Sequence, residues 1–370
     1  MIVIKGKYAC ASVYADSIDS AAEGQIKALC DLKYSDGCKI RIMPDVHAGK
    51  GCTVGTTMTV GDRIIPGLVG VDIGCGMLVV RLREKRVRLP ALDSFIQKNI
   101  PNGSAARKRS HRKSGAARLG ELIAADKLDL RSAYESIGTL GGGNHFIEID
   151  TDGDDLYLVI HSGSRAPGMR VAEYYQKLAY AACGGKEQKE IPYELACLSG
   201  NEMQSYLHDM AIMQEFAALN RCAIAEDILD GMKLHAEDSF TTVHNYIDIE
   251  SMILRKGAVS AKKGEHLLIP MNMRDGSLLC TGLGNSEWNE SAPHGAGRLM
   301  SRADAMGRIS LSEFKKSMSG IFTTSVTRAT IDESPMAYKP MESIISNIGE
   351  TVTVDKILRP VYNFKSGEGD

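Results

Sequence analysis

A carboxylate and a thiol stand three residues apart in the segment VDIGCG, residues 71–76, which follows the apolar run IIPGLVG. Asp72 and Cys75 in this segment allow two interpretations. The thiol is either a small buried hydrophobic group beside a turn aspartate, or both side chains bind a metal ion. The segment alone leaves both interpretations open, so the choice depends on which other metal-binding side chains the chain supplies.

Five of the nine histidines end an apolar run or lie in glycine-rich backbone: His47, His145, His161, His244 and His294. If their strands share a sheet, the imidazoles would project into a common crevice. With Asp72 and Cys75 they form a carboxylate, thiolate and imidazole set, which suits divalent transition metals. No CxxC pair is present, so the set does not resemble a zinc finger. The other four are expected to be surface or packing residues: His111, His208, His235 and His266.

Two further motifs favour anion binding. HSGSR, residues 161–165, brings small residues and Arg165 directly after a strand-like run, where backbone amides and a guanidinium could hold a phosphate. HGAGRLMSR, residues 294–302, repeats the arrangement, and Arg298 and Arg302 would share one face if this segment were helical. The alternative is a glycine-capped helix with surface arginines. A serine nucleophile is disfavoured because the G-x-S-x-G elbow is absent.

The whole chain has the composition of a globular protein. Its 370 residues are 44% hydrophobic and 24% charged, and no apolar run approaches the roughly 18 residues of a membrane span. The N-terminus is too polar for a signal peptide. Nine cysteines without a framework spacing indicate a reducing, cytoplasmic location. The net charge of −2 gives no overall basic excess, although AARKRSHRK, residues 105–113, is a local basic patch or a solvated loop.

Short apolar runs between glycine turns predict strands up to about residue 85, and again in GMLVVRL, HFIEI, LYLVIHSG, EHLLIPM and SLLCTG. Residues 115–137 have helical composition, and residues 168 to about 232 carry apolar side chains at helical spacing. His208 lies within that apolar stripe. The segment GGGNH lacks the helix that a dinucleotide fingerprint requires. The sequence therefore predicts a mixed α/β (α+β) fold, as one domain over residues 1–370.

At this point a family resemblance becomes visible. The segments MPDVHAGKGCTVGTTM, GVDIGCGM, GGGNHFIEI, VIHSGSR, HNYIDIE, RKGA, GLGN, HGAGRLMSR and DESPMAYK resemble, in order, the motifs of the RtcB family of RNA ligases. The match runs from about residue 40 to residue 365. The ordered series makes the resemblance specific, because no single motif would suffice.

The resemblance implies a function. Members of this family join RNA that ends in a 2′,3′-cyclic phosphate or 3′-phosphate to RNA with a 5′-hydroxyl, in RNA repair or tRNA splicing. They use GTP and two manganese ions. A histidine is guanylylated, GMP passes to the RNA 3′-phosphate, and the 5′-hydroxyl attacks the activated end. The fold implied is a single-domain α/β architecture of sheets flanked by helices around a deep, histidine-lined metal cleft. The resemblance also suggests archease as an activating partner, and whether this chain needs one stays open.

Residue by residue, the resemblance assigns roles. Cys75 matches the thiolate that bridges two ions, with His161 and His244 on one ion and Asp72 and His145 on the other. His294 matches the guanylylated histidine and Asp45 an essential acid. Arg165 and Arg302 match residues that hold RNA phosphate. The expected GTP contacts are Asn144, Glu148, Asn245, Asn272, Ser277, Gly295, Gly297, Tyr338 and Lys365.

The chain departs from the family pattern in places. It is shorter than many members, which suggests a divergent branch. In PMNMRDGS, residues 270–277, Asn272 stands where a serine is common, so the strictness of the GTP preference is open. Two other functions are weighed: a metal-dependent phosphodiesterase or phosphatase that has lost ligation, and a non-catalytic RNA-binding or assembly protein. The retained His294 argues against the first, and the full ligand set argues against the second.

Overall fold

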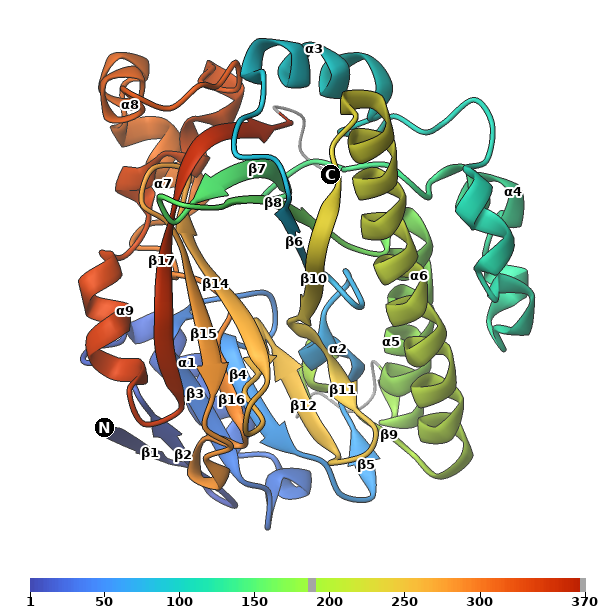
Figure 1. Ribbon diagram of the computed structural model, residues 1–370. Coiled ribbons are helices and arrows are strands. Elements are labelled where there is room, and N and C mark those ends of the chain that lie inside the picture. Colours follow the sequence, from blue (N-terminus) through green and yellow to red (C-terminus); the bar gives the residue numbers. More distant parts are fainter. Residues whose placement is uncertain (186–190, 367–370) are drawn as a thin grey trace.

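Two large β-sheets form the framework of the computed structural model, which describes residues 1–185 and 191–366 (Figure 1). The six-stranded sheet has the order β1-β2-β3-β4-β12-β11, and only its β2–β3 pair is parallel. Its strands are β1 (Ile2–Lys5), β2 (Cys10–Val13), β3 (Ile40–His47), β4 (Val54–Thr59), β12 (Ile253–Lys256) and β11 (Asn245–Asp248).

The seven-stranded sheet has the order β10-β6-β8-β7-β17-β15-β14 and is antiparallel throughout. Its strands are β10 (Ala236–Val243), β6 (Gly76–Leu82), β8 (Leu156–Ser162), β7 (Phe146–Thr151), β17 (Val352–Lys365), β15 (Gly276–Gly282) and β14 (His266–Asn272). Two short pairs complete the strands: β5 (Arg63–Ile64) with β9 (Leu198–Ser199), and β13 (Ala258–Ser260) with β16 (Ser291–Pro293). The two large sheets meet at His244, the single residue between β10 and β11.

Helices flank the sheets (Figure 1). The α-helices are α1 (Ser20–Cys30), α2 (Pro66–Val69), α3 (Leu89–Asn99), α4 (Leu130–Glu135), α5 (Arg165–Ala182), α6 (Gly200–Met232), α7 (Arg302–Arg308), α8 (Leu311–Ser317) and α9 (Met341–Ile348). The 3₁₀ turns are η1 (Lys33–Ser35), η2 (Arg112–Ala116), η3 (Leu119–Glu121), η4 (Ala125–Lys127), η6 (Tyr193–Leu195), η7 (Ser286–Trp288), η8 (Arg328–Glu333) and η9 (Pro335–Ala337). The mixed α/β prediction is confirmed, while the extent of a single domain over residues 1–370 stays a prediction.

Helix α6 connects the two halves of the interior. Met203, Met210 and Phe216 in its first half pack in the core beside the six-stranded sheet. Ile224 and Ile228 in its second half pack in the core beside the seven-stranded sheet. The apolar stripe predicted from the sequence is therefore real, and it fixes one sheet relative to the other. His208 lies on the exposed side of α6, where its Nε2 contacts the carbonyl oxygen of Glu121 at 3.0 Å.

Three local expectations differ from the structure. Residues 115–137 do not form one helix but the 3₁₀ turns η3 and η4 and the short helix α4, with the last residues of η2 at the start of the segment. The helical pattern from residue 168 to 232 is divided into α5 and α6 by a stretch that includes η6 and β9. Arg298 precedes α7, so it does not share a helix face with Arg302. Single-sequence periodicity detects amphipathic spacing but not where a chain reverses direction.

Asn220, near the middle of α6, is fully buried and holds two loops. Its Oδ1 accepts hydrogen bonds from the amides of Gly138 and Thr139, at 2.8 and 3.0 Å. Its Nδ2 donates to the carbonyl oxygens of Thr139 and Gly163, at 3.1 and 3.0 Å. A single amide side chain thus fixes the segments that lead to β7 and leave β8. Among the described residues, no helix combines the length and apolar character needed to cross a bilayer.

Replacing Asn220 by alanine should destabilise the protein by roughly 2–4 kcal/mol, because several buried backbone groups would lose their partner at once. The free energy of unfolding, measured by urea titration, checks this. Gln204→Ala is the matched control, since it removes an exposed amide from the same helix and should change stability by less than about 0.5 kcal/mol. Equal losses of stability in the two variants would contradict the role of Asn220 in holding the two loops.

Candidate metal centre and active site

Five side chains from four separate segments meet where the two large sheets join. Asp72 and Cys75 lie in the turn between α2 and β6, and the Cys75 amide donates to the Asp72 carbonyl oxygen at 3.2 Å. His145 immediately precedes β7, and His161 is the penultimate residue of β8. His244 lies between β10 and β11, where its amide donates to the carbonyl oxygen of Cys75 at 3.0 Å. The ends of these strands therefore bring together residues that are far apart in sequence.

The Cys75 sulfur is the centre of this cluster. Its Sγ lies 3.4 Å from Nε2 of His145 and 3.3 Å from Nε2 of His161. Oδ2 of Asp72 lies 3.1 Å from the same nitrogen of His145. The rings of His161 and His244 have centroids 5.1 Å apart. Two potential metal sites result, Cys75 with His161 and His244, and Cys75 with Asp72 and His145; the ligand atoms of each lie within 4.8 Å of one another.

Backbone carbonyls fix which ring nitrogen faces the sulfur. Nδ1 of His145 lies 2.9 Å from the carbonyl oxygen of Leu140, and Nδ1 of His161 lies 3.2 Å from that of Asn144. A carbonyl oxygen only accepts, so Nδ1 of His161 carries the hydrogen and its Nε2 directs a lone pair towards Cys75. Nδ1 of His145 also faces a donor, Nη1 of Arg165 at 3.2 Å, so the Leu140 contact does not by itself fix the tautomer of that ring. Nδ1 of His244 is buried and has no hydrogen-bond partner among the described residues.

The charges of the cluster suit a cation. Burial lowers the pKa of His161 and of His244 well below the ordinary value, so both rings are neutral and can offer an electron pair to a metal ion. Burial acts to raise the pKa of Asp72, but hydrogen bonding to His145 outweighs it and the pKa lies below its usual range. Burial and then the Asp72 carboxylate raise the pKa of the Cys75 thiol. A divalent ion could replace the thiol hydrogen and bind the converging sulfur, oxygen and nitrogen lone pairs, so the residues fit a metal pair.

The carboxylate of Asp72 is held by the HSGSR segment. Oδ1 accepts a hydrogen bond from the Ser164 amide at 2.9 Å. Gly163 is required beside it, because a Cβ at that position would lie 2.1 Å from the same oxygen. The segment predicted to present amides to a phosphate thus binds the protein's own carboxylate. Arg165 packs beside His145, with Nη1 3.2 Å from Nδ1 of that ring, and Nη2 donates to the Gly103 carbonyl oxygen at 3.3 Å.

Arg221 of α6 lies buried behind the metal ligands and was not anticipated from the sequence. Its Nη1 donates to the carbonyl oxygens of Gly74 and Ser162, at 2.9 and 3.0 Å. These two residues flank Cys75 and His161, so the guanidinium ties the ligand turn to the end of β8. The only signal for it in the sequence is a charged residue that interrupts an apolar helix.

His294, which follows β16, is paired with Asp45 of β3. Nδ1 of His294 lies 2.7 Å from Oδ2 of Asp45, and the His294 amide donates to the same oxygen at 3.2 Å. The fully buried carboxylate therefore holds the hydrogen on Nδ1 and leaves Nε2 with a lone pair. The His294 ring adjoins that of His244, with centroids 4.9 Å apart. Gly297, at φ 75°, lets the chain pass the Asp45 carbonyl oxygen, which a Cβ would approach to 2.2 Å.

Lys339 anchors the strand end that carries Asp45. Its Nζ donates to the carbonyl oxygens of Pro44 and Val46, both at 2.9 Å. Burial lowers the pKa of this ammonium, while Asp45 opposes that effect. The last residue of DESPMAYK thus fixes the backbone on both sides of Asp45, a role that was not expected from the sequence.

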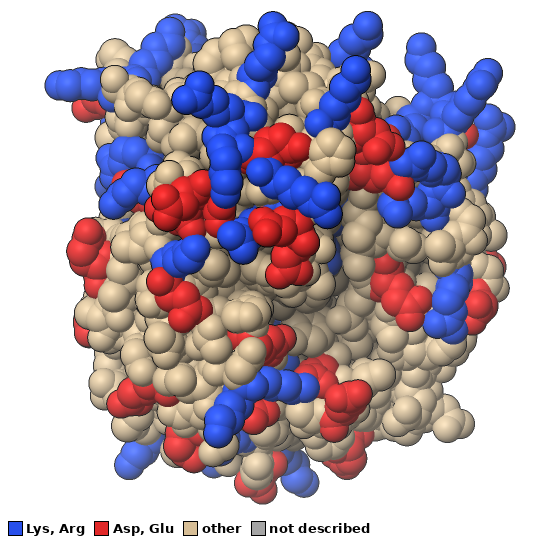
Figure 2. All heavy atoms as spheres, in the orientation of Figure 1, with Lys and Arg blue, Asp and Glu red and all other residues tan. Residues whose placement is uncertain are grey.

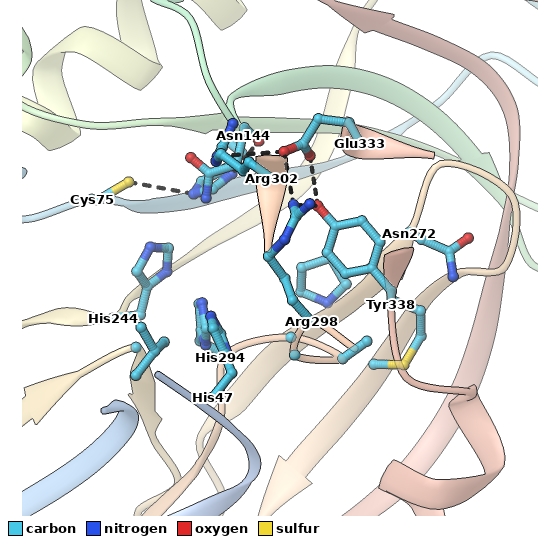
Figure 3. Close-up of a pocket in the computed structure, with 18 of the residues that line it drawn as sticks. His47, Cys75, Asn144, His244, Asn272, His294, Arg298, Arg302, Glu333 and Tyr338 are labelled. Carbon is cyan, nitrogen blue, oxygen red and sulfur yellow. Dashed lines mark hydrogen bonds and ion pairs between the residues drawn. The ribbon is translucent and has the colours of Figure 1, made fainter. Parts of the chain in front are cut away.

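A cavity of about 720 Å³ joins these groups (Figure 3), within the roughly 300–1,000 Å³ of small-molecule sites. Of the residues expected to act in the site, His145, Asp45, Arg165 and Ser277 do not line it. Those that do line it are Asp72, Cys75, Asn144, Glu148, His161, His244, Asn245, Asn272, His294, Gly295, Gly297, Arg302, Tyr338 and Lys365. Figure 3 draws Cys75, His244 and His294 on one side, and Tyr338 and Asn272 on the other.

Glu333 organises the second side of the cavity and was missed as a site residue. Its carboxylate accepts from the Tyr338 hydroxyl at 2.6 Å and from Nζ of Lys365 at 2.7 Å. Arg298 and Arg302 approach it at 3.3 and 3.4 Å. Burial acts to raise its pKa, yet the charges of Lys365 and Arg302 bring it down to about 2. Its presence in the motif DESPMAYK was the available signal.

Glu148 also lines the cavity, and Nδ2 of Asn363 donates to its carboxylate. Burial raises the pKa of Glu148 to about 7, against the opposing charge of Lys365. Asn272 points into the β14–β15 turn instead, where Oδ1 accepts from the Arg274 and Asp275 amides and Nδ2 donates to Asp275 at 2.8 Å. The amide that replaces the usual serine is thus engaged within its own hairpin.

The basic segment 105–113 is partly neutralised by α6. Arg107 pairs with Asp227, and Arg112 pairs with Glu226 and Asp230. Nε2 of His111 lies 3.2 Å from Asp227. In Figure 2, Lys and Arg gather along the upper edge of the molecule over α3 and the chain leading to α4, with acidic side chains among them. The segment is therefore a mixed surface, and its charge alone does not favour nucleic acid.

Comparison with known proteins gives a consistent family. The family model described as tRNA-splicing ligase RtcB matches residues 25–128 and 112–366. The RNA-splicing ligase RtcB of Escherichia coli K12 is 33% identical over 375 aligned residues, which cover 88% of this chain and 90% of the relative. The tRNA-splicing ligase RtcB of Aeropyrum pernix is 28% identical, with 86% of each chain covered. The RNA-splicing ligase RtcB2 of a second Escherichia coli strain is 27% identical, with 88% of each covered.

Cys75→Ala should weaken Mn²⁺ binding by more than 100-fold, because it removes the sulfur common to both ligand groups. In the parent protein, affinity should rise with pH by up to about tenfold per unit, since the thiol must lose its proton before it binds. Isothermal titration calorimetry at pH 6.5, 7.5 and 8.5 measures both effects. Cys280→Ala is the control, because it removes a buried thiol that lies in a separate apolar cluster. Unchanged affinity in Cys75→Ala would exclude the bridging role.

Proposed function

The chain belongs to the RtcB family of RNA ligases, and on this premise we propose that it joins RNA 2′,3′-cyclic-phosphate or 3′-phosphate ends to 5′-hydroxyl ends, with GTP and two manganese ions. The observation that carries the proposal is the convergence of Asp72, His145 and His161 on the Cys75 sulfur, beside His294. RNA repair or tRNA splicing is the process that follows from the family, and archease is proposed as an activating partner.

The metal pair is proposed to lie between the two ligand groups, with Cys75 shared. His161 and His244 would hold one ion, and Asp72 and His145 the other. The chemistry that two divalent ions supply is neutralisation of phosphate charge and alignment of the attacking and leaving oxygens. Support comes from the tautomer of His161, because the Asn144 carbonyl leaves its Nε2 lone pair directed at Cys75.

His294 is proposed as the nucleophile towards GTP. Its Nε2 would attack the α-phosphorus, forming an N–P bond and releasing pyrophosphate. The Asp45 carboxylate, 2.7 Å from Nδ1, would stabilise the positive charge that develops on the ring. GMP would then pass from His294 to the RNA 3′-phosphate. Gly295 and Gly297 on either side of Ala296 keep side chains away from the approaching phosphorus.

The opposite side of the cavity is proposed to bind the guanine nucleotide. Guanine offers two neighbouring N–H donors, on N1 and the 2-amino group, and the Glu148 carboxylate could accept both. Tyr338 and Lys365, with Asn144 and Asn245, would surround the nucleotide, and Glu333 would hold Tyr338 and Lys365 in place. Ser277 and Asn272 would contribute through the β14–β15 backbone, since the Asn272 side chain is used within its turn.

Arg302 is proposed to bind RNA phosphate. It lines the cavity, half of its side chain is exposed, and it pairs with Asp332 at 2.8 Å. Arg298 stands beside it, with Nη2 donating to the Asp332 carbonyl oxygen at 2.6 Å. Arg165, the other arginine expected to hold phosphate, would first have to release the Gly103 carbonyl oxygen. Arg302 is therefore the stronger candidate of the two.

His294→Ala should abolish a covalent protein–GMP adduct while leaving metal binding intact, because the imidazole is the acceptor but belongs to neither ligand group. Protein incubated with α-labelled GTP and Mn²⁺ and then denatured at neutral pH reports the adduct, and acid treatment should release the label because an N–P bond to histidine is acid-labile. His235→Ala, which removes an exposed histidine paired with Glu84, is the control.

Joining of a 2′,3′-cyclic-phosphate oligonucleotide to a 5′-hydroxyl one, with and without GTP, completes this test. Ligation by the parent without any adduct would refute the proposed route. Opening of the cyclic phosphate with neither adduct nor ligation would instead favour the metal-dependent phosphodiesterase.

GTP affinity should rise about tenfold from pH 6 to pH 8, since the pKa of Glu148 lies near 7 and only its ionised form accepts both guanine donors. Calorimetry in the His294→Ala background, where no adduct forms, measures the binding. The additional substitution Glu148→Gln should weaken binding and flatten this dependence. Glu250→Gln changes an exposed acid and should leave the dependence as it was. A pH-independent affinity in the parent would contradict the proposed contact.

A further inference from the structure

His47 is the one histidine of the cavity that the proposed mechanism does not use. It ends β3, two residues after Asp45, and its side chain lines the cavity with that of His294. Its Nδ1 lies 2.9 Å from the carbonyl oxygen of Asp45. Asp45 therefore contacts two imidazoles, His47 through its backbone and His294 through its carboxylate.

The contact with Asp45 fixes the tautomer of His47. A carbonyl oxygen only accepts, so Nδ1 carries the hydrogen and Nε2 retains its lone pair. Among the described residues, no group forms a hydrogen bond with that Nε2. Burial lowers the pKa of His47, with smaller effects from the charges of Asp45, His294 and Lys339. At neutral pH the ring is thus an unprotonated base that faces the cavity.

The other imidazoles of the candidate site are already engaged. The Nε2 atoms of His145 and His161 converge on Cys75, and His244 belongs to the same ligand set. The proposed mechanism uses Nε2 of His294 to form the bond to phosphorus. Asp45 is fully buried and bonded to His294. Asp19, a further carboxylate of the lining, caps α1 through the Ala22 amide at 2.8 Å. His47 is the cavity imidazole whose Nε2 lone pair neither faces the potential metal ligands nor forms the proposed bond to phosphorus.

The position of His47 suits the last step of ligation. The proposed function brings the RNA 3′-phosphate to His294, where it receives GMP. Figure 3 draws His47 with His294, and both side chains line the cavity. The RNA 5′-hydroxyl must reach that same phosphate to attack it, so it comes to the part of the cavity where His47 stands.

We propose that His47 is the general base that takes the proton from the RNA 5′-hydroxyl in the ligation step, an inference that rests on the proposed function. The 5′-oxygen forms a bond to the phosphorus of the RNA 3′-phosphate, and the anhydride bond to GMP breaks. The hydroxyl proton moves to Nε2 of His47, and GMP leaves with the electron pair of the broken bond. The imidazolium then returns its proton to water.

The test uses His47→Asn, because the Asn side-chain amide can still donate to the Asp45 carbonyl oxygen but offers no base. Single-turnover ligation of RNA carrying a preformed 3′-diphosphate-linked guanosine end to 5′-hydroxyl RNA should slow by about 100-fold or more. Guanylylation of His294 should stay within threefold of the parent, and the guanosine-capped RNA should accumulate from 3′-phosphate RNA. His235→Gln, an exposed histidine, should behave as the parent.

The pH profile separates base catalysis from a structural role. The parent's single-turnover ligation rate should rise with pH and then reach a plateau as His47 loses its proton, whereas His47→Asn should lack that rising limb. Ligation by His47→Asn within threefold of the parent would overturn the proposal. So would an equal loss of His294 guanylylation, which would make His47 a support for Asp45. A parent that forms neither adduct nor ligated RNA would show that the proposed function itself fails.

Discussion

The site depends on one constraint: a thiol, a carboxylate and two imidazole nitrogens are buried in contact at one point. The thiol of Cys75, the carboxylate of Asp72 and the Nε2 atoms of His145 and His161 lie within 3.1–3.4 Å of a neighbour in the group. Such an arrangement is unfavourable in an apolar interior unless a cation balances it. The Asn144 carbonyl holds the hydrogen of His161 on the side of the ring away from Cys75. The group therefore favours a bound cation.

Two elements keep that arrangement in register. Helix α6 spans both cores, and from its middle Asn220 and Arg221 bind the loops beside β6, β7 and β8. Strand β3 approaches from the other sheet, and Lys339 fixes the backbone on either side of Asp45. The potential metal ligands thus depend mainly on one sheet, and Asp45, the partner of the proposed nucleophile His294, on the other. His244, at the junction of the sheets, touches the rings of both His161 and His294.

On the far side of the cavity, beside Tyr338, several cationic side chains surround one carboxylate. Glu333 is buried, and Arg298, Arg302, Lys365 and the Tyr338 hydroxyl all converge on it. A buried acid with several cationic partners stays ionised and holds their long side chains in fixed positions. The carboxylate offsets part of the repulsion among these cations. A nucleotide or RNA phosphate that enters would meet groups already in place, so less conformational entropy would be lost on binding.

The sequence by itself determined the family, the α/β class and which side chain types could meet, because ordered motifs and residue chemistry are local properties of a chain. The motifs indicated a ligand set, and its members do come together in the structure: Asp72, Cys75, His145, His161 and His244. Composition did not predict that residues 115–137 form short separate turns and a helix. Spacing did not show whether Arg298 and Arg302 share a helix, because it does not report where a chain turns. The tertiary structure alone decided the tautomers of the histidines, the burial of Arg221 and the gathering of charges on Glu333. Each of these depends on which backbone carbonyl or carboxylate a distant segment places within hydrogen-bond distance, and only the packed sheets and helix α6 set those distances.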